Sequence, residues 1–248
     1  MANDASKVLR AAQIIFITGT DTGVGKTLFT ASWLRYLREN NTDTIAMKPF
    51  CSGGRDDVEL LQSLQADARL PDAVVNPYYF DAPVSPLVAA RRQRRALSLQ
   101  DTLIRIRALA RDRDCLLVEG AGGLLSPLGP RFDAAELIAR LRCRVIIVAR
   151  NQIGTINHIL LTVRALPENS TFPPIIVLME TAEPDPSAAS NPAIICEMLP
   201  NLAVFIFPYL GPDANRPETV IQHSQPMKKF FNNLMRRVEF GQKKSPEK

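Results

Sequence analysis

The stretch between residues 19 and 27 constrains the fold of this chain more than any other part of the sequence. It reads GTDTGVGKT, follows an apolar run at residues 14–17, and leads directly into a segment with the helical spacing of apolar residues. A glycine-rich turn between a buried strand and a helix directs backbone N–H groups toward an anion. Lys26 then supplies charge to the terminal phosphates, and the Thr27 hydroxyl is placed to bind Mg²⁺. The stretch therefore predicts a phosphate-binding loop, in a variant form with Gly19 one position earlier than the usual first glycine.

Short apolar runs recur along the chain and alternate with segments of helical spacing. The runs are residues 14–17, Thr44–Met47, 115–118, 145–149, Ile175–Met179 and Ala203–Phe207, and the helical segments are 26–40, 99–110, 134–141 and 156–166. This alternation predicts a single α/β domain of the P-loop type, a mostly parallel sheet with helices on both faces. Ligands bind such sheets at the carboxyl ends of the strands. Functional side chains are therefore expected directly after the apolar runs.

The domain is expected to span residues 14–240, between a flexible segment at 1–13 and a basic disordered tail at 241–248. Two segments that contain prolines, 71–86 and 183–192, are expected to be surface loops. A basic amphipathic stretch at 228–238 is expected to pack its apolar face on the body of the protein, and the arginine-rich run at 91–95 to be a solvated surface.

Composition narrows the class of protein. Of 248 residues, 46% are hydrophobic and 22% charged, which is typical of a globular protein and not of a disordered, collagen-like or membrane-embedded one. The net charge of +5 suits an anionic ligand but does not call for nucleic acid. No secretory signal or apolar run long enough to cross a bilayer is visible, so a cytoplasmic protein without membrane partners is expected. The four cysteines form no CxxC pair, and Cys115 and Cys143 are expected to be buried apolar residues.

Two charged residues stand where apolar runs end. Lys48 follows the second run, a position that fits either a surface lysine or a functional one. Glu119 ends the third run and precedes a glycine-rich turn, where a carboxylate is costly unless it is paired or bound to metal. Of Asp56 and Asp57, one is expected to be a helix N-cap and the other a metal ligand. Thr27, Asp57 and Glu119 together form the set of hard oxygen ligands that Mg²⁺ prefers.

A second helix N-terminus is expected after the fourth run, within residues 151–158. It would receive a carboxylate or phosphate, or else be an ordinary helix start capped by Thr155, and the residues alone leave both interpretations open. His158 is expected to be a solvent-facing or packed histidine rather than a general base, since no carboxylate partner is near it in the sequence.

Several separated motifs, in the same order along the chain, resemble the dethiobiotin synthetase family. They are Gly19 to Thr27, Lys48-Pro49 with Ser52-Gly53, Asn76-Pro77-Tyr78 leading to Ser85-Pro86, Val118 to Gly123, and Gly154 to His158. Together they extend over about residues 14–211. In that family ATP drives ring closure of 7,8-diaminopelargonic acid with CO₂, through a carbamate that is phosphorylated before the second amine attacks it.

The resemblance implies a role for each matching residue. The residues implied in catalysis are Lys26, Lys48, Thr22 and Ser52. Those implied in nucleotide binding are Gly23, Val24, Gly25, Lys26, Thr27, Leu28, Asp57, Glu119, Gly120, Ala121, Gly122, Glu180, Thr181, Pro208, Tyr209 and Leu210, with Mg²⁺ on Thr27, Asp57 and Glu119. Those implied in substrate binding are Thr22, Ser52, Ser85, Gly154, Thr155, Ile156 and Asn157. The last four would receive the carboxylate of the diamine from the neighbouring subunit of a homodimer.

One position departs from the family pattern. After residues 175–179 the family often has an asparagine that reads the adenine edge, and this chain has Glu180-Thr181. An amide both donates and accepts hydrogen bonds, whereas an ionised carboxylate only accepts them. The substitution predicts a relaxed or altered nucleotide preference, with other nucleoside triphosphates accepted besides ATP.

Three other interpretations share parts of the pattern. A partitioning-type switch ATPase normally has a second lysine early in the loop, where this chain has Asp21. Cobyrinic acid amide synthetases need a glutamine-hydrolysing domain for which no residues remain. A nucleotide-binding module without catalysis would bind ATP but would not respond to a diamine.

Overall fold

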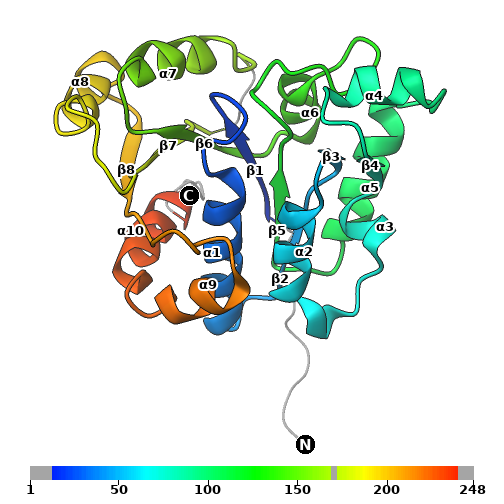
Figure 1. The fold of residues 1–248 in the computed structure, drawn as a ribbon, viewed down its shortest axis with the longest axis horizontal. Helices are drawn as coiled ribbons and strands as arrows, with labels where there is room; N and C mark the ends of the chain where they lie inside the picture. Colours follow the sequence, from blue (N-terminus) through cyan, green and yellow to red (C-terminus); the bar gives the residue numbers. More distant parts are fainter. Residues whose placement is uncertain (1–12, 169–171, 240–248) are drawn as a thin grey trace, which may run out of the picture.

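The computed structural model describes residues 13–168 and 172–239 (Figure 1). Of the predicted flexible segment at 1–13, only Gln13 is described, and it is the first residue of a strand. The predicted tail at 241–248 lies outside the described residues.

All six predicted strands form, and they make one parallel sheet. The strands are β1 (Gln13–Gly19), β2 (Thr44–Met47), β5 (Cys115–Glu119), β6 (Arg144–Arg150), β7 (Ile175–Met179) and β8 (Ala203–Phe207). Their order across the sheet is β2-β5-β1-β6-β7-β8, and every neighbouring pair is parallel. The central strands read as apolar runs because helices cover both of their faces.

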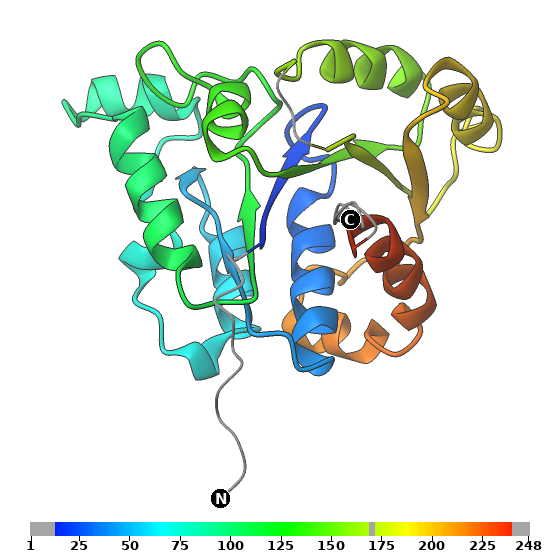
Figure 2. The same ribbon diagram turned by 180° about the vertical axis from the view of Figure 1, so that it is seen from behind.

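Helices pack on both faces, as predicted, and the two faces have separate apolar cores. One face is covered by α1 (Lys26–Glu39), α2 (Asp56–Ser63), α9 (Pro217–His223) and α10 (Lys228–Glu239). The other is covered by α4 (Pro86–Arg92), α5 (Leu99–Ala110), α6 (Ala134–Leu141), α7 (Thr155–Arg164) and α8 (Asn191–Met198). In Figures 1 and 2, α1, α9 and α10 lie on one side of the sheet, with α6, α7 and α8 on the other.

The prediction of a surface loop at residues 71–86 was wrong. This segment contains α3 (Asp72–Val75) and β4 (Tyr78–Phe80), and β4 pairs in parallel with β3 (Phe50–Ser52) in a small second sheet; a 3-10 turn (Ala66–Ala68) precedes α3. Phe80 is fully buried, and the Tyr78 ring stacks on Phe50 with the ring centroids 4.8 Å apart. The other predicted loop, 183–192, is mostly turn but ends inside α8, where Asn191 is buried.

The remaining packing predictions are confirmed. Phe231, Leu234 and Val238 of α10 are buried against the core, and Cys115 and Cys143 are buried as well. Residues 91–95 are exposed. Within the described residues, no helix combines the length and the apolar character needed to cross a membrane.

Candidate active site

The loop between β1 and α1 has the backbone conformation of an anion cradle. Gly23 and Gly25 have φ angles of 71° and 98°, a left-handed conformation that glycine adopts without steric cost. Gly25 is the N-cap of α1 and no side chain caps the helix, so its first N–H groups remain available to a ligand. The Lys26 ammonium donates to the Asp21 carbonyl across the loop, 2.8 Å away. Burial lowers the pKa of Lys26 to about 8, even though Glu119 opposes that shift.

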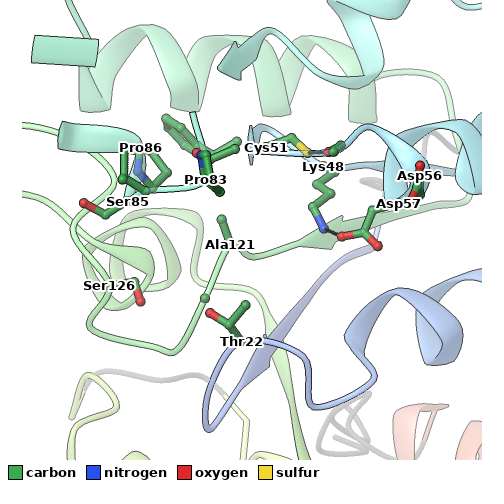
Figure 3. A pocket seen from close by; sticks show the side chains of 15 residues that line it. Thr22, Lys48, Cys51, Asp56, Asp57, Pro83, Ser85, Pro86, Ala121 and Ser126 are labelled. Carbon is green, nitrogen blue, oxygen red and sulfur yellow. Dashed lines mark hydrogen bonds and ion pairs between the residues drawn. The ribbon is translucent and has the colours of Figure 1, made fainter. Parts of the chain in front are cut away.

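Lys48 is the centre of a cluster of charges at the ends of β2 and β5. Its ammonium donates to the Asp57 carboxylate, a contact drawn in Figure 3. The same ammonium also donates to Oε1 of Glu119, at 2.7 Å. Lys48 is 6% exposed and Glu119 0%, so each charge depends on the other for compensation. Burial alone would lower the pKa of Lys48, but the two carboxylates outweigh burial and raise it above its usual value. Lys48 is thereby held fully charged at neutral pH.

The oxygens around this cluster suit a hard divalent cation. The Thr27 hydroxyl donates to Oε1 of Glu119 over 2.7 Å, and Oε2 of Glu119 is buried without a hydrogen-bond partner among the described residues. Burial would raise the pKa of Asp57, but Lys48 outweighs it and the pKa is lowered, which favours the anion. In the described part of the chain no three His, Cys, Asp or Glu side chains gather as a metal site. Thr27, Asp57 and Glu119 nevertheless offer the hard oxygen donors that Mg²⁺ prefers, and the unpartnered Oε2 of Glu119 leaves one of them free for a ligand.

Neither aspartate at the start of α2 caps the helix. Its N-cap residue is Arg55, and no side chain accepts a hydrogen bond from the first turn. The prediction that Asp56 or Asp57 is an N-cap was therefore wrong. Asp57 is engaged with Lys48, and Asp56 is exposed at the wall of a cavity.

Two cavities meet at the charge cluster. The smaller, about 180 Å³, is the phosphate cavity, lined by Thr22, Gly23, Gly25, Lys26, Thr27, Leu28, Lys48, Asp57, Glu119 and Asn215. The larger, about 530 Å³, is the acceptor cavity, lined by Thr22, Lys48, Phe50, Cys51, Ser52, Gly54, Asp56, Asp57, Pro83, Val84, Ser85, Pro86, Ala121, Gly122 and Ser126. Thr22, Lys48 and Asp57 belong to both (Figure 3). A molecule in the acceptor cavity would lie beside the terminal phosphate of a nucleotide in the phosphate cavity.

The structure brings three of the seven sequence-predicted substrate residues to the acceptor cavity. Thr22, Ser52 and Ser85 line it, and the Ser52 hydroxyl is buried without a partner in the described chain. The turn Gly154 to Asn157 lies elsewhere, and of its residues Thr155 lines a third cavity of about 180 Å³ with Thr20, Asp21, Thr22, Val24, Arg150, Gln152 and His158. The N-cap of α7 is Gly154, so the alternative in which Thr155 caps the helix was wrong.

The residues predicted to read the base come at the carboxyl ends of β7 and β8. Glu180 and Thr181 directly follow β7, and Pro208 to Leu210 directly follow β8. None of them lines the phosphate cavity. The Leu210 side chain packs in the core, whereas Tyr209 is 43% exposed.

Sequence reasoning assigned no role to three residues that shape the site. Arg150 donates from Nε and Nη2 to the carbonyl of Gly23, at 3.1 and 2.8 Å. Asn215 lines the phosphate cavity, and Asn76 donates from Nδ2 to the carbonyl of Lys48 at 2.7 Å. Arg150 ends a buried run, the same signal that singled out Lys48, but Asn215 follows an irregular segment and has no such signal.

A phosphate-binding loop beside a lysine and carboxylates at the carboxyl edge of a parallel sheet defines a P-loop nucleotide-dependent protein. A family model described as AAA domain matches residues 13–215. The structure of pNOB8 ParA bound to nonspecific DNA is similar, with a TM-score of 0.56 and 15% identity over 93% of this chain and 100% of that one. The hydrogenase maturation factor HypB from Archaeoglobus fulgidus has a TM-score of 0.53 and 14% identity over 91% of each chain. At these identities the two structures establish the fold alone.

Curated relatives place the chain within that class. It is 41% identical over 207 residues to the ATP-dependent dethiobiotin synthetase BioD of Anaeromyxobacter sp. (strain K), covering 82% of this chain and 92% of the relative. It is 34% identical over 187 residues to the protein of the same name from Bacillus subtilis (strain 168), covering 73% and 80%. The chain belongs to the ATP-dependent dethiobiotin synthetase family.

Proposed function

We propose that the chain closes the ureido ring of dethiobiotin from 7,8-diaminopelargonic acid, CO₂ and ATP, releasing ADP and phosphate. The observation that carries this proposal is the junction of the two cavities at Lys48 and Asp57. A switch ATPase needs only the phosphate cavity, whereas a synthetase also needs room for an acceptor in line with the terminal phosphate. The acceptor cavity of about 530 Å³ supplies that room.

The chemistry proceeds in three steps in this family. One amine of the diamine adds to CO₂ and forms a carbamate. A carbamate oxygen attacks the terminal phosphorus of ATP, and the bond to ADP breaks. The second amine then attacks the carbonyl carbon of the mixed anhydride, the carbon–oxygen bond to phosphate breaks, and the ring closes.

The charged residues of the site serve the second step. Lys26 and Lys48 both line the phosphate cavity, so their ammonium groups would stabilise the negative charge of the transferring phosphoryl group. Thr27, Asp57 and Glu119 would hold Mg²⁺, which would neutralise phosphate charge. The backbone of the loop that includes Gly23, Gly25 and Lys26 would surround the phosphates. The turn Gly120 to Gly122, which was predicted to bind nucleotide, instead contributes Ala121 and Gly122 to the acceptor cavity.

The uncharged residues position the acceptor. Thr22, Ser52 and Ser85 orient the diamine within the acceptor cavity. The unpartnered Ser52 hydroxyl supports this role, because a buried hydroxyl without a hydrogen bond is costly unless a ligand satisfies it.

A homodimer would complete the site. The turn Gly154 to Asn157 of the neighbouring subunit would receive the carboxylate of the diamine. Two features support this proposal: the N-terminus of α7 has no side-chain cap, and Ile153 beside it is 76% exposed. A cytoplasmic location is part of the same proposal, since the reaction consumes ATP.

The direct test measures phosphate release and detects the product by mass. The purified protein is given Mg²⁺, ATP and bicarbonate, with 7,8-diaminopelargonic acid added or omitted. Release that depends on the diamine, with dethiobiotin formed, supports the proposal. Hydrolysis that is indifferent to the diamine favours the partitioning-type switch ATPase, whose fold this chain resembles.

A further inference from the structure

The nucleoside of a bound nucleotide must extend toward β7 and β8. The terminal phosphate lies by Lys48 and Glu119, at the ends of β2 and β5, and the acceptor cavity occupies the space beyond them. On the other side of β1, the sheet continues as β6, β7 and β8. With strands about 4.8 Å apart, β7 lies about 10 Å from β1, a distance that the sugar and the inner phosphates of a nucleotide span.

Contacts of the loop also point to the end of β7. Met179, the last residue of β7, packs against Gly25, its Cε 3.0 Å from the place where a Cβ on Gly25 would lie. Asn215, a few residues beyond β8, lines the phosphate cavity. The residue directly after Met179 is Glu180, which is half-buried.

The carboxylate of Glu180 is held in place by a buried amide. Asn151, 1% exposed, donates from Nδ2 to Oε1 of Glu180 at 2.8 Å and to the carbonyl of Ala188 at 3.1 Å. Its Oδ1 accepts from Nδ2 of Asn191, which is 2% exposed. Because both donors of the Asn151 amide have acceptors and its Oδ1 accepts from Asn191, the NH₂ group is held facing Glu180. Oε2 of Glu180 accepts no hydrogen bond from the described residues.

A fixed carboxylate distinguishes the bases by their donors. The Watson–Crick edge of guanine carries two adjacent donors, N1–H and the 2-amino group, and the two oxygens of a carboxylate accept from both. Adenine and cytosine each present one amino donor beside a ring nitrogen that accepts, so the second carboxylate oxygen would face another acceptor. A site that meets a base with the wrong partner leaves buried polar groups unpaired and rejects that base strongly.

We infer that Glu180 is a specificity-determining residue that makes this chain favour guanine over adenine nucleotides as the phosphoryl donor. The preference among phosphoryl donors rests on the proposed function, whereas a preference in nucleotide binding can be tested without it. ATP remains a donor in this chain, and GTP is the better one.

The test compares nucleotides and a matched pair of variants. For the full chain, kcat/KM for dethiobiotin formation is measured with the Mg²⁺ salts of GTP, ATP, CTP and ITP, and GTP should exceed ATP by about tenfold or more. ITP lacks the 2-amino group and should fall below GTP. Glu180→Gln has the same shape, keeps an oxygen for Asn151 and gains a donor, so it should abolish the preference for GTP. Glu183→Gln, on an exposed residue nearby, removes the same charge and should keep that preference.

A second measurement separates this inference from the proposed function. Binding of GDP and ADP is measured by titration calorimetry without a diamine. Tighter binding of GDP, lost in Glu180→Gln, supports the inference even if no dethiobiotin forms, in which case only the proposed function fails. Equal or tighter binding of ADP, or a GTP-to-ATP ratio that Glu180→Gln leaves unchanged, overturns the inference.

Discussion

At the scale of single residues, the site depends on charges that are buried together. Lys48 and Glu119 are almost completely shielded from water, so each ion requires the other. One rule, that a charged residue at the carboxyl end of a buried strand has a function, drew attention to both positions, but for Lys48 it left a surface lysine equally open. The rule gives position but not partners, so it could not show that Lys48 pairs with both Glu119 and Asp57. The pairing changes what a substitution at Lys48 is expected to do.

Lys48→Ala should lose turnover and also lose stability, by about 3 kcal/mol, because it leaves the buried carboxylate of Glu119 unpaired. From the sequence alone, normal folding would be expected for this variant. The double variant Lys48→Met/Glu119→Gln removes both charges and should recover most of the free energy of unfolding without recovering turnover. Denaturant unfolding and steady-state kinetics check both parts, and near-native turnover in Lys48→Ala would refute the catalytic role.

Lys26 should make nucleotide binding depend on pH. Its pKa of about 8 in the free protein means that the ammonium loses its proton as pH rises through 8, and bound phosphates should restore the charge. Nucleotide affinity should therefore fall above about pH 8, with uptake of a proton on binding. Calorimetry in buffers of different ionisation enthalpy measures that uptake, and Lys26→Met should show none at this site.

The same lowered pKa has the opposite effect on stability. Between pH 8 and 10.5 the unfolded chain holds more protons at Lys26 than the folded chain does. The contribution of Lys26 to the free energy of unfolding therefore rises with pH over that range.

The prediction for nucleotide binding has its own contrary outcome. If the nucleotide affinity of Lys26→Met falls with pH as steeply as that of the parent protein, Lys26 is not the group that titrates.

At the scale of elements, the main sheet was predictable and the small one was not. The strands of the main sheet are buried on both faces and read as continuous apolar runs. β3 and β4 have three residues each, a partly buried polar or aromatic position in each, and prolines nearby, so no run marks them. Their pairing depends on packing between Phe50 and Tyr78, which are distant in sequence. The acceptor cavity was correspondingly harder to predict than the phosphate loop.

α10 is an element whose docking can be tested directly. Phe231 is fully buried between Tyr36 and the aromatic rings of Phe29 and Phe207, whereas Phe230 is half-buried. Phe231→Ala should cost about 3–5 kcal/mol, as large cavities in a core do. Phe230→Ala should cost clearly less. Chemical denaturation of both variants checks the order, and equal costs would mean that α10 does not pack as described.

At the scale of the whole molecule, the proposed homodimer predicts rescue between inactive variants. Lys48→Ala disables the subunit that holds the nucleotide, and Asn157→Ala disables the turn offered to the neighbour. In a mixed dimer, one site receives both defects and the other receives neither. After the subunits exchange, activity should reach about a quarter of that of the parent protein. If the activity of the mixture does not exceed the activities of the two variants measured separately, each site is built within one chain.

β2 and β5 lie side by side in the sheet, yet residues 48–114 separate them along the chain. This single stretch supplies β3, α2, β4 and the start of α4, and with them most of the wall of the acceptor cavity. The loop and strands that handle phosphate lie outside it, apart from Lys48 and Asp57. The phosphate-binding part and the wall of the acceptor cavity thus come from separate stretches of the chain. Replacement of residues 48–114 by another segment that keeps Lys48 and Asp57 would therefore change which amine the protein accepts and leave its phosphate-binding part unchanged.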